Sequence, residues 1–464
     1  MPRAPVTLKV AGKAVVAALA VFAAPAAASA APPSLQAAIG NPSDLKVNAT
    51  VRVRYEALDG QSRIGLNAED DLVAIKSTLQ IEWHHGNLRV GGELDDSRAY
   101  RGKSGSSVSA NDVNAFEPIQ AYVGGNFPGA LGKGTTVSFQ AGRFTMLLGS
   151  RRFVSADEYR NATSAMTGLR MDLKARDGTA VTLFYVLPQL HLPDDQPSVL
   201  RNRFALDHQG LDLTLWGSLV SRPLSLAGLS AEAGFYRLDE RDTPGRLTRD
   251  RHLSTISARL AREPKAGRLD FDLEGAVQRG RISASTAPGA ALLDVDAGFV
   301  HAGIGYSFAG RAKARLSATY DYVSGDGAGA NYNRFDTLYG SRRTEFGPGG
   351  IYSTIGRANI SSPGVRLELA PGKRFDAMLA YRAMWLASRT DAFSTTGVRD
   401  VSGTSGRFAG HQFDVRFRYW LVPGLLRGEI NADWIAKGRF LKVAPNAPQT
   451  GDTHYVSTAL TASF

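Results

Sequence analysis

Basic residues gather in one stretch of the sequence, in a pattern that can bind anions. The candidates lie between residues 141 and 170, and they are Arg143, Arg152, Arg160, Asn161 and Arg170. A guanidinium group presents a planar fork of N–H donors, which matches a carboxylate or phosphate through two parallel hydrogen bonds. The cluster therefore predicts recognition of an anionic group, provided that the fold brings these side chains together. The alternative is that the arginines pair with carboxylates on neighbouring strands and serve only the structure.

Other kinds of chemistry find less support in the sequence. The chain has no cysteine, which excludes disulfides, thiolate metal sites and cysteine nucleophiles. Residues 132–135 resemble a phosphate-binding loop, but Phe127 stands where that motif needs glycine and Gly134 follows the lysine, so a turn is predicted. The acids between 321 and 336 lack calcium-loop spacing, and the eight histidines are scattered. We predict no catalytic residue, no metal and no cofactor, although spacing alone does not exclude a Ser/His or Asp/His site assembled by folding.

Strands must position the basic cluster, because a period of two dominates the sequence from Lys46 onward. Each run has one apolar phase and one polar phase, and no segment after the first thirty residues sustains a helical period. Four clear runs carry their apolar residues at 47–55, 211–215, 269–273 and 413–419.

The connections between these runs sort into two classes. Eight are short and rich in Gly, Pro, Asp or Asn, as turns require: 84–87, 127–134, 176–178, 222–228, 263–267, 309–311, 371–373 and 422–424. Nine are long and polar: 58–70, 99–114, 148–164, 188–206, 240–250, 281–294, 324–352, 390–406 and 438–452. Seventeen connections delimit eighteen strands, and alternation of short turns with long loops is typical of bacterial outer-membrane barrels.

The two ends of the chain agree with that interpretation. Arg3, Lys9 and Lys13 precede a short apolar run, and Ala28-Ser29-Ala30 supplies small residues for cleavage, so residues 1–30 are predicted to be a secretory signal peptide. The apolar run is too short to span a bilayer as a helix. At the other end, apolar and small residues alternate up to Phe464. An amphipathic last strand with a terminal Phe resembles the signal by which outer-membrane barrels are recognised for assembly.

The predicted fold is therefore all-β: a transmembrane antiparallel β-barrel of about eighteen strands in one domain, residues 45–464. Residues 31–44 form a short periplasmic lead, and an even strand count leaves both termini in the periplasm. The apolar phase faces lipid and the charged phase lines a lumen wide enough for water. The alternative fold, a secreted soluble β-protein, does not explain the division into short and long connections.

Two stretches carry a resemblance to a known family. The first contains Gly142-Arg143-Phe144, Arg152-Phe153, Arg160-Asn161 and Gly168-Leu169-Arg170. The second is Tyr320 to Asp326, followed by Phe335-Asp336 and Leu338-Tyr339. Both are similar to elements of the alginate export family of outer-membrane proteins. The resemblance implies an eighteen-stranded barrel with an arginine-lined pore for an anionic polysaccharide, and it implies pore roles for Arg143, Arg152, Arg160, Asn161 and Arg170.

These expectations lead to a functional hypothesis. We predict an outer-membrane channel, not an enzyme, that passes an anionic oligo- or polysaccharide such as alginate; the alternatives are a general or small-solute porin and, further off, a barrel enzyme. The expected partners are outer-membrane lipid and lipopolysaccharide, the saccharide or small-solute ligand, and the barrel assembly machinery. Nucleic acid is not expected, because the charges are interleaved along exported strands. The 324–352 loop, the longest, is predicted to cap the extracellular mouth, with the arginine cluster as an anion filter beside it.

Overall fold

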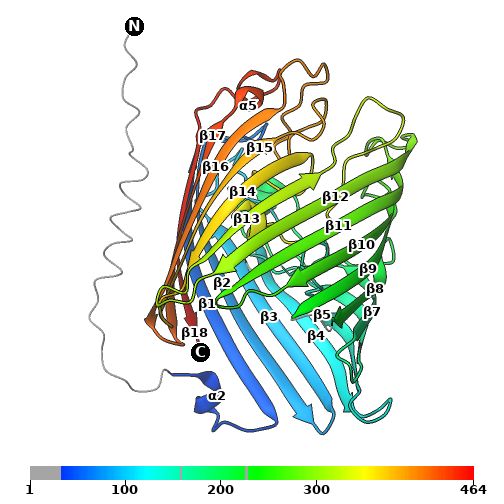
Figure 1. Ribbon diagram of the computed structural model, residues 1–464, viewed down its shortest axis with the longest axis vertical. Helices are drawn as coiled ribbons and strands as arrows, with labels where there is room; N and C mark the ends of the chain where they lie inside the picture. The colour runs from blue at the N-terminus through cyan, green and yellow to red at the C-terminus, as the bar shows by residue number, and fades with distance from the viewer. Residues whose placement is uncertain (1–32, 157–158, 225–227) are drawn as a thin grey trace.

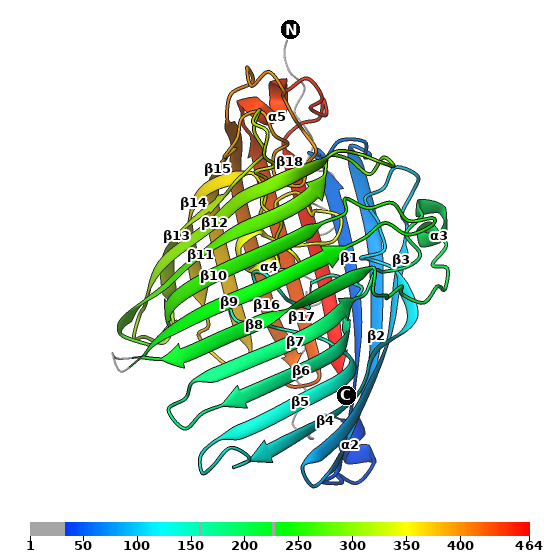
Figure 2. The same cartoon turned by 90° about the vertical axis from the view of Figure 1, so that its right-hand side faces the viewer.

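Eighteen antiparallel strands form one closed barrel in the computed structural model (Figure 1 and Figure 2), which describes residues 33–156, 159–224 and 228–464. Each strand pairs with its neighbours in sequence, and β1 pairs with β18 to close the sheet. The predicted all-β barrel and its strand count are confirmed. The strands are β1 Leu45–Asp59, β2 Glu69–His85, β3 Leu88–Tyr100, β4 Asn114–Pro128, β5 Thr136–Phe144, β6 Met166–Lys174, β7 Ala180–Pro188, β8 Leu213–Pro223, β9 Leu229–Glu240, β10 His252–Arg262, β11 Arg268–Ser283, β12 Leu292–Ser307, β13 Arg315–Val323, β14 Ile360–Leu369, β15 Phe375–Trp385, β16 Phe408–Val422, β17 Leu426–Lys437 and β18 Thr453–Ser463.

The two ends of the barrel differ in their connections. All eight short connections lie at one end, here called the turn end, and all nine long ones lie at the other, the loop end. The C-terminus and the short helix α2 (Leu35–Ala38) lie at the turn end (Figure 1). The residues predicted to form signal peptide precede the described part of the chain.

The described residues contain four short helices that were not predicted. Besides α2 they are α3 (Gln196–Leu200), α4 (Arg343–Phe346) and α5 (Arg439–Val443), all in long loops. A helix of four or five residues completes little more than one turn, so it leaves no readable period in the sequence. Local capping holds some of them: the Asp195 carboxylate accepts a hydrogen bond from Ser198 N at 2.9 Å. Within the described residues, no helix is both long and apolar enough to cross a membrane.

Most of the barrel wall is apolar outside and charged inside. On β11, for example, Leu269 and Leu273 are 55% and 46% exposed on the outer face, whereas Asp270 and Glu274 are buried on the inner face. This is the inverse of a soluble protein and matches a barrel whose outer surface meets lipid.

Strand β8 departs from the predicted phase. Leu213 and Leu215 were assigned to the outer, apolar phase, but both are buried inside the barrel, and Trp216 is the outward residue, 40% exposed. The prediction was wrong here because it assumed a water-filled lumen opposite every strand. Next to β8 the lumen is filled by apolar loop residues, so an apolar inner face is buried there as well.

The filling consists of two long loops, 145–165 and 324–359, which we call the plug. They pair with each other through backbone hydrogen bonds: Ser155 N donates to Tyr339 O at 2.9 Å, and Tyr339 N donates to Phe153 O at 2.9 Å. Figure 2 shows α4, part of the second loop, inside the barrel. The longest loop was predicted to cover the mouth; in the structure it extends into the lumen.

Aromatic packing anchors the plug to one side of the wall. Phe153 contacts Tyr236 of β9 and Phe299 of β12, with ring centroids 5.4 and 5.9 Å apart, and it also contacts Phe335 of the other plug loop at 6.3 Å. Such pairs contribute about 0.5–1.5 kcal/mol each beyond the area they bury. An aromatic cluster therefore joins the plug to β7–β12, and the buried apolar cluster continues on the other side to Leu58 of β1 and Tyr455 of β18. Open space remains toward the turn end.

Candidate functional site

The open space is a cavity of about 570 Å³ on the turn-end side of the plug, here called the vestibule. Its wall comes from β1–β3 and β16–β18, together with residues of the 145–165 loop. Six cations and two carboxylates line it: Arg52, Arg54, Lys76, Arg416, Arg418, Arg427, Glu93 and Glu429. The alternation of the strands explains this lining, because every second residue of β1, β16 and β17 points inward.

Carboxylates outside the lining hold several of these cations in place. Arg54 Nε donates to Glu56 at 2.7 Å, and Lys76 Nζ lies 2.9 Å from Asp95. Arg418 Nε donates to Asp376 at 2.9 Å. These pairs order the side chains, and they leave the excess of positive charge in the vestibule modest.

Arg427 and Trp420, both half-buried, form a paired cation and aromatic ring in the vestibule lining. The guanidinium carbon of Arg427 lies 5.7 Å from the Trp420 ring centroid, a cation–π arrangement. The buried Nε of Arg427 has no hydrogen-bond partner among the described residues. The residue nevertheless borders the cavity, so its terminal nitrogens are the donors that an anion in the vestibule would meet.

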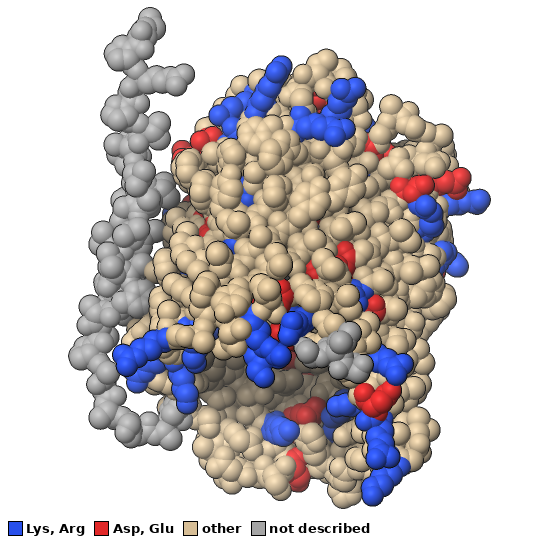
Figure 3. Space-filling model, viewed as in Figure 1, with Lys and Arg blue, Asp and Glu red and all other residues tan. Residues whose placement is uncertain are grey.

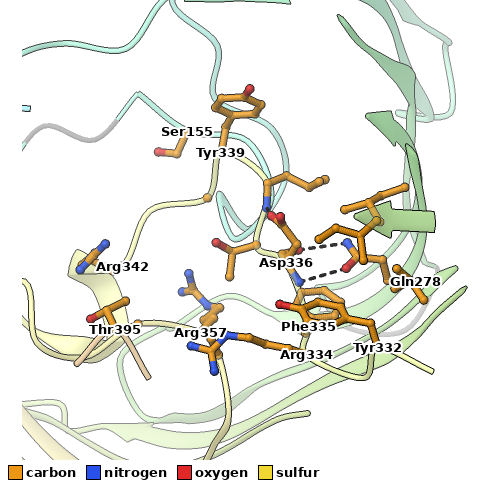
Figure 4. Close-up of a pocket in the computed structure, with 18 of the residues that line it drawn as sticks. Ser155, Gln278, Tyr332, Arg334, Phe335, Asp336, Tyr339, Arg342, Arg357 and Thr395 are labelled. Carbon is orange, nitrogen blue, oxygen red and sulfur yellow. Dashed lines mark hydrogen bonds between the residues drawn. The ribbon is translucent and has the colours of Figure 1, made fainter. Parts of the chain in front are cut away.

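A second basic cavity, of about 400 Å³, lies on the loop-end side of the plug, and we call it the loop-end pocket (Figure 4). Its cations are Arg160, Arg334, Arg342 and Arg357, and Asp336 is the acidic residue in its lining. Gln278 of β11 fixes the pocket wall, because its side-chain amide exchanges two hydrogen bonds with the Asp336 backbone, each 3.0 Å long (Figure 4).

The plug separates the two cavities, and β1 provides one set of its anchors. Ser155 and Arg160 border the loop-end pocket, whereas Tyr159 borders the vestibule. Arg52 Nη2 donates to Arg160 O at 2.8 Å, and Arg54 Nη1 donates to Tyr159 O at 2.5 Å. Two steps along the same strand, the carboxylate of Glu56 accepts a hydrogen bond from Ile351 N of the other plug loop at 3.0 Å. Alternate inward residues of β1 therefore hold both loops across the lumen.

Arg152, predicted to act as an anion filter, lies buried among carboxylates. Its guanidinium contacts Glu274 at 2.6 Å and Asp272 at 2.9 Å, both on β11, and Glu345 of the second plug loop at 3.0 Å. Arg357 adds a further ion pair to Glu345. In this structure Arg152 joins both plug loops to the wall, and it borders neither cavity.

Arg160 and Asn161 occupy adjacent positions with different surroundings. The Arg160 side chain borders the loop-end pocket, and its Nη1 donates to Asn111 Oδ1 at 3.1 Å. Asn161 is fully buried, and its amide donates to the backbone oxygens of Ile75, Arg98 and Asp112 at 2.9–3.1 Å. The structure thus gives Asn161 a supporting position, while Arg160 is the one predicted residue that meets a cavity.

Arg143 and Arg170 are on the barrel wall, each with its own carboxylate. Arg143 contacts Glu117 at 2.5 Å and donates to Pro118 O at 2.6 Å. Arg170 forms two parallel hydrogen bonds with Asp172, at 2.8 and 2.9 Å. Neither borders the two cavities described above, so the sequence cluster does not come together as one site.

The fold assembles one constellation that spacing did not reveal. His191 Nδ1 lies 2.9 Å from Asp207, and its Nε2 lies 3.4 Å from Ser164 Oγ. The order Ser–His–Asp matches a hydrolase triad, but Asp207 also accepts hydrogen bonds from Asn114 and from Leu192 N, and the Ser–His distance is long for an activated nucleophile. The three residues join loop 145–165 to loop 189–212. The described residues contain no cluster of His, Asp and Glu arranged to hold a metal ion.

Asp112 is a titratable group beside the plug. It lies in the 101–113 loop, where Ser109 N donates to its Oδ2 at 3.0 Å. Burial, reinforced by the charge of Glu56, raises the pKa of Asp112 to about 6. Its backbone oxygen accepts one of the Asn161 hydrogen bonds, so this buried carboxyl lies next to an anchor of the plug.

The vestibule was not selected from the sequence, although its cations were assigned to the inward phase. Arg52 of β1 and Arg427 of β17 are far apart in the chain and become neighbours through β18, which pairs with both strands. A readable signal does exist: Arg416, Arg418 and Arg427 flank the same turn on the polar phase. Because these three arginines lie at similar distances from that turn, the sequence could have predicted a basic lining at the turn end.

Comparison with known proteins gives one family and several structural relatives. The family model described as alginate export matches residues 43–451. The structures of Pseudomonas aeruginosa OpdQ, OccK8 (OprE) and the outer membrane protein OpdK are similar in fold, with TM-scores of 0.57, 0.56 and 0.56 at 13%, 12% and 12% identity. The matches cover 90%, 91% and 91% of this chain and 97%, 98% and 99% of those proteins. No curated protein matches the chain.

Proposed function

The chain belongs to the alginate export family and forms an outer-membrane channel, and on that premise we propose that its substrate is an anionic oligo- or polysaccharide. Short turns of bacterial outer-membrane barrels face the periplasm. The vestibule then opens toward the periplasm and the loop-end pocket toward the cell exterior. The substrate crosses by way of both cavities when the plug moves.

The observation that carries the proposal is the pair Arg427 and Trp420 in a vestibule with more cations than carboxylates. A uronate residue has an apolar face of C–H groups and a carboxylate at its edge. The indole ring of Trp420 can pack against the first, and the guanidinium of Arg427 can bind the second. A neutral sugar lacks the carboxylate, and a small inorganic anion lacks the apolar face.

Single-channel recording tests the proposal. Wild-type protein in a planar bilayer should be blocked by an oligouronate of about six residues, and a neutral maltohexaose should block it much less. Arg427→Gln should raise the dissociation constant of the block about tenfold, because a desolvated charged hydrogen bond contributes on the order of 1.5–3 kcal/mol.

The matched control is Arg279→Gln, which removes an arginine from the outer face of β11 (side chain 59% exposed) and should leave the block unchanged. A general porin would show current without discrimination between the two hexasaccharides. That outcome, or equal block in both variants, would contradict the proposal.

Three companion proposals concern biogenesis and surroundings. Residues 1–30 direct export and are removed, which N-terminal sequencing of the outer-membrane protein can check. The last strand with Phe464 is recognised by the barrel assembly machinery, and deletion of Phe464 should lower the amount of assembled barrel. The apolar outer face contacts outer-membrane lipid and lipopolysaccharide.

A further inference from the structure

One sector of the loop end carries exposed cations without exposed acids. It consists of two connections that the structure describes throughout: 386–407, which joins β15 to β16, and 438–452, which contains α5. Figure 3 shows basic side chains at the top of the molecule, where Figure 1 places α5. Five cations are exposed on these two connections, and we call them the rim cluster: Arg389, Arg399, Arg407, Arg439 and Lys442.

The acids of the same two connections compensate little of this charge. Asp391 and Asp400 are buried: Asp391 pairs with Arg334 of the plug at 2.7 Å, and Asp400 accepts hydrogen bonds within its own loop. Asp452 is half-buried and lies 3.9 Å from Lys442, and among the described residues this is the one ion pair of the rim cluster. The four arginines of the cluster are therefore exposed without a carboxylate partner in the described part of the chain.

An aromatic band on the outer face of β15–β18 lies next to the rim cluster. Its exposed members include Trp385, Phe413 and Trp434. Trp385 packs against Phe408 with ring centroids 5.4 Å apart, and Phe413 packs against Trp434 at 5.2 Å. Aromatic side chains on the outside of a membrane barrel lie at the level of the lipid headgroups. The band therefore indicates where the membrane surface meets this side of the barrel.

The backbone places the rim cluster directly beyond the aromatic band. Arg407 precedes the first residue of β16, and Arg439 is the first residue of α5. A hydrogen bond of 2.7 Å from Gly438 N to Ala409 O holds the ends of β16 and β17 together between them. Lys442 lies three residues after Arg439 and thus on the same side of α5. These cations occupy the level at which an outer-leaflet lipid presents its headgroup.

Exposed arginines in other sectors of the loop end have carboxylate partners. Three such pairs lie on or beside β2–β3 and β11–β12: Arg101 with Asp71, Arg279 with Asp296, and Arg281 with Asp294. A pair of opposite charges has no net charge with which to attract a phosphate from a distance. In contrast to these pairs, the arginines of the rim cluster keep their charge for an external anion.

We propose that the rim cluster and the aromatic band form a binding site for a phosphorylated glycolipid of the outer leaflet, the lipid A part of lipopolysaccharide. The guanidinium groups bind the phosphates on its sugars through charge-assisted hydrogen bonds, and the aromatic rings pack against its sugars and acyl chains. Charge complementarity favours this partner over a zwitterionic lipid. The inference rests on the membrane orientation in the proposed function and is independent of the saccharide that the channel passes.

Titration of the detergent-purified protein with fluorescent lipid A tests the site. Wild-type protein should bind phosphorylated lipid A more tightly than lipid A from which the phosphates have been removed. The difference should persist in EDTA, because the arginines contact phosphate without a bridging metal ion. The variant Arg407→Gln/Arg439→Gln/Lys442→Gln should raise the dissociation constant of phosphorylated lipid A about tenfold, since an exposed ion pair contributes roughly two- to fivefold.

The matched control removes three exposed arginines that have carboxylate partners, Arg101→Gln/Arg279→Gln/Arg281→Gln, and it should bind phosphorylated lipid A as wild type does. Heat-dependent gel mobility checks that both variants are folded barrels. The comparison of the two forms of lipid A on wild-type protein tests the inference even if a variant fails to assemble.

Equal affinity of wild type for lipid A with and without phosphate, or equal loss of affinity in the two variants, would overturn the inference. It is also overturned if the rim-cluster variant keeps its affinity for lipid A and instead loses affinity for the soluble oligouronate, since the cluster then serves the saccharide. Failure of the oligouronate to block the wild-type channel would contradict the proposed function, and it would leave the affinity for lipid A unchanged.

Discussion

Replacement of Arg152 by methionine should loosen the plug, because one buried carboxylate then loses its ion-pair partner. Arg152 is 4% exposed and bonds Asp272, Glu274 and Glu345. After the replacement, Asp272 keeps Arg259 at 2.6 Å and Glu345 keeps Arg357. Glu274, with a side chain 4% exposed, retains only the Ser150 hydroxyl at 3.0 Å among the contacts described here. Breaking a buried pair from one side costs about 3–5 kcal/mol, chiefly through the charge left behind.

The double variant Arg152→Met/Glu274→Gln distinguishes this reasoning from simple loss of contacts. It also removes the unpaired charge of Glu274. We therefore expect the double variant to regain about half or more of the plug stability that Arg152→Met loses, although it has one charged group fewer. The measurements are the frequency of conductance fluctuations in planar bilayers and the rate of proteolysis of the plug loops in detergent. Both should rise strongly in Arg152→Met and fall again in the double variant. A double variant no better than the single one would refute the argument. Unchanged plug behaviour with altered ion selectivity would instead support the sequence-based hypothesis that Arg152 filters anions.

Further predictions concern the plug and its surroundings. Because the raised pKa of Asp112 favours the protonated form in the folded protein, Asp112 stabilises the fold most below about pH 4. As the pH rises through 6, the free energy of unfolding should fall by about 3 kcal/mol. Asp112→Asn should flatten this part of the pH dependence of urea unfolding. Gly350 has φ +60°, and a Cβ there would overlap the Glu56 carboxylate, so Gly350→Ala should increase the open probability in single-channel records, whereas Gly310→Ala, in open space, should not. Ser164→Ala should leave hydrolysis of p-nitrophenyl acetate at the level of wild type; a Ser164-dependent rate would show that the contact with His191 is catalytic.

Strand number and connection lengths could be predicted because they depend on local pattern. Alternation and turn residues are read within a few positions, so the division into eight turns and nine loops agrees with the structure. The inner face of β8 could not be read in this way. Leu213 and Leu215 are buried because Phe153, sixty residues earlier, packs in the lumen on that side, and only the folded loops reveal this.

The same limit applies to the candidate site. Arg143, Arg152 and Arg170 are close in the sequence, which suggested a single cluster. In the structure each forms an ion pair with a different carboxylate, because the inner face of each strand contacts different neighbours. The cavity cations Arg52 and Arg427 depend on barrel closure, which alternation does not encode. Only Arg160 was chosen from the sequence and also meets a cavity.

The position of Tyr159 has a consequence for how the molecule is assembled. Its backbone oxygen binds Arg54 of β1, while its hydroxyl lies 2.6 Å from that of Tyr455 and 3.0 Å from Ser457 Oγ, both on β18. One residue of the plug thus contacts both β1 and β18, the first and last strands, where they pair to close the barrel. Strands so distant in the chain join late, because a long loop must close first. Tyr159 has both its β1 contact and its β18 contacts only after these strands have paired, so closure of the barrel wall completes this anchor of the plug.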